Sequence, residues 1–143
     1  MEKAKKNLKF YSIFILLLVA VSCARLIVDA CVNGIPVHVT EGMSLETAKT
    51  ISKIAFGLSF VIFLPQLYVA LKGWKISNGA ITGKAPRVWA VILTVCFAIS
   101  AIRGFIAMFD AFSFNSFVAM LDPLVDAIIF ASVYLCMRKI AKA

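Results

Sequence analysis

Four long apolar runs, separated by shorter polar segments, organise the sequence. Each run is long enough to form a helix that crosses the ~30 Å hydrocarbon core of a bilayer, which takes about 20 residues. The runs cover residues 10–32, 47–71, 88–109 and 114–137. We therefore predict an all-α membrane protein, with residues 1–143 forming one domain that is a bundle of four transmembrane helices.

Polar and proline residues mark where these helices should start and bend. Residues 33–46 form a glycine-containing loop, in which Ser44 can cap the next helix. Glu46 lies in the first turn of that helix, where the positive end of the helix dipole stabilises its negative charge. Pro65 lies inside the second run and Pro123 inside the fourth. Because proline removes one helical hydrogen bond, we expect a kink at each of these positions.

The composition excludes an ordinary soluble domain and gives no sign of catalytic chemistry. The chain is 62% hydrophobic and has a mean hydropathy of +0.97, well outside the soluble range. Its four cysteines include no C-x-x-C pair, and His38 has no second histidine or cysteine near it. Because no nucleophile and base are paired either, we predict no catalytic residue, no metal site and no cofactor.

The basic residues indicate the orientation of the helices. The net charge of +8 would suggest nucleic acid in a soluble protein, but here the charge gathers at helix ends. Segments 1–9, 72–87 and 138–143 hold four, four and three lysines or arginines, whereas loops 33–46 and 110–113 hold none. This asymmetry predicts a multi-pass protein of the cell membrane with both termini cytoplasmic, and no nucleic-acid partner.

Ionisable residues also occur within the apolar runs, where each costs roughly 2.5–3.5 kcal/mol. Asp122 and Asp126 are four residues apart, so both should project from one face of the last helix. At about 1.5 Å per residue, every predicted helix brings such a group to the outer half of the membrane. The candidate ion- or substrate-binding residues are Asp126, Asp122, Arg25, Arg103, Asp29 and Lys53.

These residues have two interpretations. In the structural one, Arg25 pairs with Asp29 and Arg103 with Asp122, and the pairs fix the register of the bundle. In the functional one, the set lines a water-filled cavity open to the outside. Asp126, the deepest acid, then lies at its floor as a proton or cation site, near a carbonyl freed by the adjacent proline.

Two segments carry a resemblance to a known group of proteins. Residues 66–75 (QLYVALKGWK) and 121–135 (LDPLVDAIIFASVYL) are similar to small, uncharacterised four-span membrane proteins of Gram-positive gut bacteria. That resemblance covers residues 47–143 and implies no activity. Pro65-Gln66 also resembles the dipeptide of PQ-loop carriers, but there it lies early in a helix of a three-span repeat, and here it lies late in the second of four helices.

Two functions follow as hypotheses. The first is a subunit, or a homo-oligomeric component, of a membrane assembly, since 143 residues leave little protein to enclose a pathway. Its partners would be the lipid bilayer and further copies or other membrane subunits. The alternative is a small proton- or cation-coupled transporter or channel that uses Asp126 and Asp122 to bind a small ion or solute.

Overall fold

The computed structural model describes residues 1–142, and within them the fold is entirely helical. Four stretches are long and apolar enough to cross a membrane, as the apolar runs predict; the second is formed by two consecutive helices, α2 and α3. The helices are α1 (Glu2–Asn33), α2 (Leu45–Val61), α3 (Phe63–Ser77), α4 (Lys84–Asp110) and α5 (Phe114–Lys142).

The helices extend beyond the apolar runs at their polar ends. α1 begins at Glu2 and α5 reaches Lys142, because lysine, alanine, leucine and glutamate are good helix formers in water as well as in lipid. The cap expected at Ser44 is confirmed: its Oγ accepts a hydrogen bond of 3.2 Å from the backbone N–H of Thr47. Hydropathy therefore marks the apolar part of each helix and not its ends.

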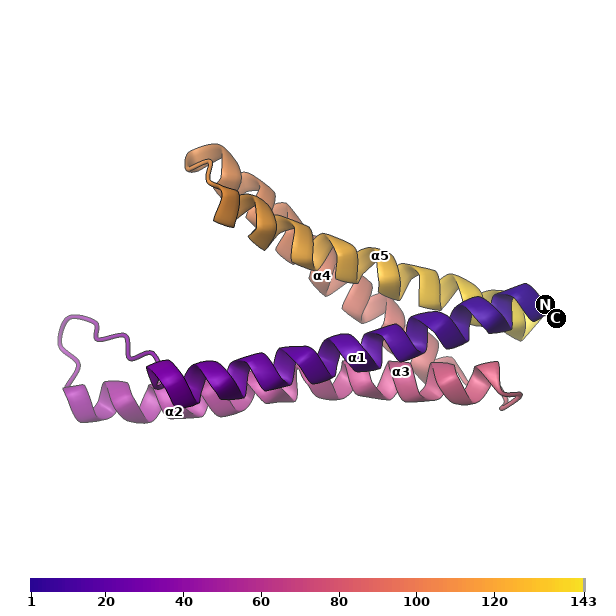
Figure 1. The fold of residues 1–143 in the computed structure, drawn as a ribbon, viewed down its shortest axis with the longest axis horizontal. Coiled ribbons are helices and arrows are strands. Elements are labelled where there is room, and N and C mark those ends of the chain that lie inside the picture. The colour runs from indigo at the N-terminus through magenta and orange to yellow at the C-terminus, as the bar shows by residue number, and fades with distance from the viewer. Residues whose placement is uncertain (143) are drawn as a thin grey trace.

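The two internal prolines differ in their effect on the helices. The helix is interrupted at Ile62, three residues before Pro65. Because the ring nitrogen of Pro65 carries no hydrogen, the carbonyl of Val61 lacks its helical donor. α2 and α3 nevertheless continue in nearly the same direction (Figure 1). α5 runs through Pro123 without interruption.

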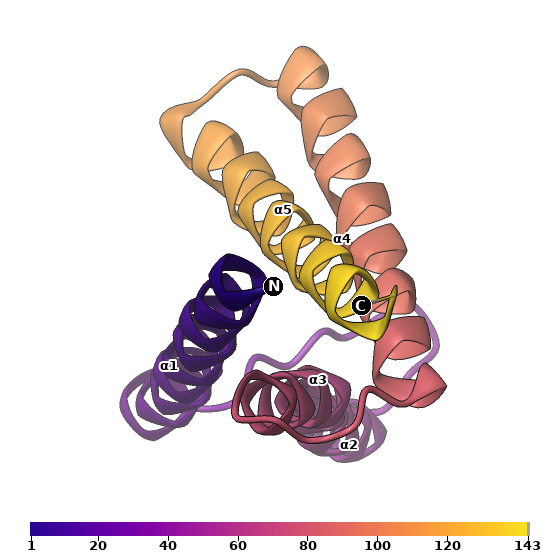
Figure 2. The same ribbon diagram turned by 90° about the vertical axis from the view of Figure 1, so that its right-hand side faces the viewer.

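The helices form two arms that meet at one end and diverge at the other (Figures 1 and 2). The first arm consists of α1 with α2 and α3, and the second is the hairpin of α4 and α5. We call the end that carries both chain termini the closed end. The open end carries the connection between α1 and α2 and the turn between α4 and α5. α1 and α3 contact α4 or α5, whereas α2 has its main contact with α3 alone.

The apolar core lies toward the closed end and draws on α1, α3, α4 and α5 but on no residue of α2. The rings of Phe97 and Phe130 stack across α4 and α5 with centroids 5.6 Å apart. Fully buried side chains of the core include Leu8, Ile15, Val69, Ile76, Phe130, Val133 and Met137. The arms are thus joined by packing at one end only.

Helices approach each other closely at two glycines, Gly73 between the arms and Gly104 within the second arm. At Gly73 of α3, an added Cβ would run into the Oγ of Ser12 in α1 and lie 3.4 Å from Cε of Met137 in α5. In the second arm, a Cβ on Gly104 would lie 3.1 Å from Cα of Met120. Glycine at both positions therefore permits an approach that a larger residue would block.

Candidate functional site

The six candidate residues divide between the two arms. Arg25 and Asp29 lie in the last third of α1 and Lys53 lies in α2, so the first arm carries a formal charge of +1 from this set. Arg103 of α4, with Asp122 and Asp126 of α5, gives the second arm a charge of −1. All lie on the parts of the arms that lead to the open end.

Most of these side chains face outward from the fold. Arg25, Asp29, Lys53, Arg103 and Asp122 are exposed, and Asp126 is half-buried. Within residues 1–142 no basic nitrogen lies within 4.0 Å of a carboxylate oxygen. The pairs expected from the sequence, within α1 and between α4 and α5, are thus not formed in the structure.

α4 and α5 approach each other closely near Pro123, yet Arg103 and Asp122 are both exposed there. Gly104 brings α4 against α5 at Met120, and a Cβ on Gly104 would lie 3.6 Å from the carbonyl oxygen of Ala119. That carbonyl is the one that a residue other than proline at position 123 would bond. Arg103 lies beside this contact but on the exposed side of α4.

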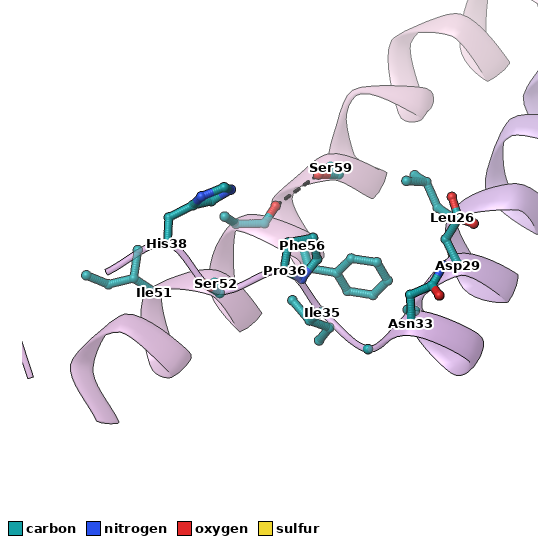
Figure 3. Close-up of a pocket in the computed structure, with 13 residues that line it drawn as sticks. Leu26, Asp29, Asn33, Ile35, Pro36, His38, Ile51, Ser52, Phe56 and Ser59 are labelled. Carbon is teal, nitrogen blue, oxygen red and sulfur yellow. Dashed lines mark hydrogen bonds between the residues drawn. The ribbon is translucent and has the colours of Figure 1, made fainter. Parts of the chain in front are cut away.

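A cavity of about 550 Å³ lies between α1 and α2 at the open end (Figure 3). It forms because the two helices diverge where the loop after Asn33 crosses from one to the other. Most of its wall is apolar, and its only carboxylate is Asp29. The lining residues are Leu26, Asp29, Ala30, Asn33, Gly34, Ile35, Pro36, His38, Ile51, Ser52, Ala55, Phe56 and Ser59.

Sequence reasoning named one residue of this cavity, Asp29, and missed the rest. Asp122 and Asp126 belong to the other arm and do not line it. Gly34, with a φ of 73°, and Pro36 mark the loop that closes the cavity on one side, and both were visible in the sequence. The divergence of α1 from α2 was not, because the apolar run of α1 holds too few polar residues to show which of its faces packs against α2.

No protein-family model, curated protein or solved structure matches this chain. The resemblance to small four-span bacterial proteins therefore stays a prediction.

Proposed function

We propose that the chain spans the cell membrane with both termini cytoplasmic and acts as a subunit of a homo-oligomeric membrane assembly. One observation carries the proposal: ionisable side chains sit on apolar helices, most of them exposed, and within residues 1–142 they have no ion-pair partner. The basic clusters at the closed end support the orientation.

The energy of burying charge makes a single copy unfavourable. Each exposed charge within the apolar runs costs roughly 2.5–3.5 kcal/mol when lipid surrounds it, apart from relief by snorkelling. Lys53 is close enough to the outer boundary to snorkel, but Asp122 lies about 12 Å inside it. A second protein surface that supplies the opposite charge removes this cost.

The charge distribution favours another copy of the same chain as that partner. Among the six candidate residues, those of the first arm have a surplus of one positive charge and those of the second arm a surplus of one negative charge. The first arm of one copy is therefore complementary to the second arm of another. A twofold axis along the membrane normal would satisfy both arms of both copies.

The proposal can be tested by exchanging charge between arms. Lys53→Asp and Asp122→Lys each place like charges opposite one another, so each variant alone should lose the oligomer. When the two variants are co-expressed with different affinity tags, they should associate. At one interface of the mixed dimer both substitutions meet, so the positive and negative charges are exchanged but still opposite in sign. At the other interface both arms are native. Oligomeric state is measured by native mass spectrometry of the tandem-purified protein.

The control for this experiment is Lys139→Asp, an equal charge change at the closed end, which should leave the oligomer intact. Pairing between the arms of one copy would not be restored by co-expression. Failure of the mixed pair to associate, or a monomeric wild-type protein in lipid nanodiscs, would refute the homo-oligomer.

A second function, a proton- or cation-coupled transporter, is favoured by the environment of Asp126. It is the one candidate carboxylate that is half-buried, and it follows the proline that leaves the carbonyl of Ala119 without its helical donor. In proteoliposomes, Asp126→Asn should abolish proton-coupled cation flux, with Asp110→Asn, an exposed acid at the end of α4, as control. Equal flux in the wild type and in Asp126→Asn excludes this role.

A further inference from the structure

We propose that the cavity between α1 and α2 binds a protonated organic amine, with the ammonium group at Asp29 and the apolar part against Phe56 and Ile51. The residues that line the site come from the first arm of one copy, so binding needs no residue of a second copy.

The charge of the lining selects a cation. Asp29 is its only acidic residue and the loop residue His38 its only basic one, so with a neutral histidine the lining carries one negative charge. Arg25 and Lys53 belong to the same arm but do not line the cavity. No basic nitrogen lies within 4.0 Å of the Asp29 carboxylate in the described chain. The carboxylate is thus free to accept charge-assisted hydrogen bonds from an ammonium group.

Further polar atoms of the lining can accept hydrogen bonds from an ammonium group. The side chain of Asn33, one turn along α1, lies on the same wall as Asp29 (Figure 3). Ser59 donates its hydroxyl hydrogen to the carbonyl of Ala55 at 3.0 Å, which leaves the oxygen able to accept. An ammonium group has three hydrogens to donate and needs acceptors of this kind.

The rest of the cavity suits an apolar body. Phe56 projects from α2 toward the α1 wall (Figure 3), where its ring can contact either an alkyl chain or the cation. Ile51 extends the apolar wall toward the loop. A volume of about 550 Å³ is within the range of small-molecule sites.

A series of three hexyl compounds tests the charge preference. Titration calorimetry on the full chain in dodecyl maltoside uses n-hexylammonium, n-hexanol and hexanoate, which share one apolar body and differ in charge. We expect the affinity to fall in that order. Equal affinity for hexylammonium and hexanol would overturn the proposal.

Variants locate the binding. Asp29→Asn should weaken hexylammonium binding about tenfold and leave hexanol binding unchanged, which also shows that the variant is folded. Phe56→Leu should weaken the binding of hexylammonium about threefold, and Ala55→Trp should fill the cavity and abolish binding of all three compounds.

The matched control is Asp110→Asn, since Asp110 is an exposed acid at the open end outside the cavity. An equal loss in Asp110→Asn, or full binding to Ala55→Trp, would place the amine elsewhere and refute the site.

Two sources offer this ligand chemistry: a free amine, or the ammonium headgroup of an outer-leaflet phospholipid. Nanodiscs of phosphatidylethanolamine and of phosphatidylglycerol separate them. Weaker hexylammonium binding in phosphatidylethanolamine identifies the lipid headgroup as occupant, and equal binding identifies a free amine. In either lipid, loss of the Asp29→Asn effect would contradict the proposal.

Discussion

Ser12, at the closed end, has a buried hydroxyl group without a hydrogen-bond partner in the described chain. Its side chain is fully buried, and its Oγ has no partner within the described chain. A buried hydroxyl without a partner costs about 1–3 kcal/mol relative to one that is bonded. The side chains of Leu8 and Met137 also reach the space beside Gly73, and neither has an oxygen or nitrogen to bond the Ser12 hydroxyl.

Replacing this hydroxyl should therefore stabilise the protein. We expect Ser12→Ala to raise the free energy of unfolding by about 1 kcal/mol, measured by reversible titration with sodium dodecyl sulfate in mixed micelles. Ser132→Ala is the control, because the Ser132 hydroxyl donates to the carbonyl of Ile128 at 2.8 Å and its loss should not stabilise. Destabilisation by Ser12→Ala would mean that the hydroxyl has a partner in the membrane.

Gly73 gives a second prediction at the same contact. Gly73→Ala should cost about 1–3 kcal/mol in the same titration, because the new methyl group meets the Ser12 Oγ. In the Ser12→Ala background the cost should be much smaller, since the obstructing atom is gone. Gly57→Ala is the control: nothing lies within 4 Å of its added Cβ, so alanine should stabilise by up to about 1 kcal/mol. Additive effects of the Ser12 and Gly73 changes would contradict this contact.

Among the elements, the junction of α2 and α3 is the place where a proline interrupts a helix. Pro65→Ala restores the N–H that can bond the Val61 carbonyl, so α2 and α3 should become one helix over residues 45–77. We expect slower hydrogen–deuterium exchange at residues 60–66, measured by mass spectrometry in detergent. Pro123→Ala is the control, because α5 already runs through that position. Unchanged exchange at 60–66 would show that something other than the proline interrupts the helix.

The same elements show how far sequence reasoning extends. Four helical stretches long and apolar enough to cross a membrane, and the Ser44 cap, follow from local signals, which are apolar length and a serine before a helix. The divergence of the arms does not, because membrane helices are apolar on every face and their pattern does not reveal which face packs. The small residues Ser12 and Gly73 permit a close approach of α1 and α3 at the closed end, and neither stands out from the many small residues in the chain.

The site could be predicted to the same limited extent. The positions of Arg103, Asp122 and Asp126 within their helices follow from counting residues. Whether they pair depends on helix rotation, which a single sequence does not specify. The cavity beside Asp29 depends on the separation of two helices that have few contacts with each other.

For the whole molecule, the orientation in the membrane is the property to measure. With the four native cysteines replaced by alanine, Thr40→Cys in the α1–α2 connection should react with a membrane-impermeant maleimide in intact cells. Asn78→Cys, between α3 and α4, should react only after the cells are opened, because the positive-inside rule places that loop in the cytoplasm. The reverse labelling pattern would contradict cytoplasmic termini, and labelling of both in intact cells would contradict four spans.

The joining of the arms at one end has a mechanical consequence. α1 has 32 residues and is thus about 48 Å long, and the 21 residues from Ser12 to Asn33 place its open end about 32 Å from the contacts around Ser12. Each arm pivots at the closed end, so a rotation of about 5° there moves the open end by about 2.8 Å. A displacement of that size is about the length of a hydrogen bond. Adding one methyl group at Gly73 therefore shifts the positions of charged residues tens of ångströms away.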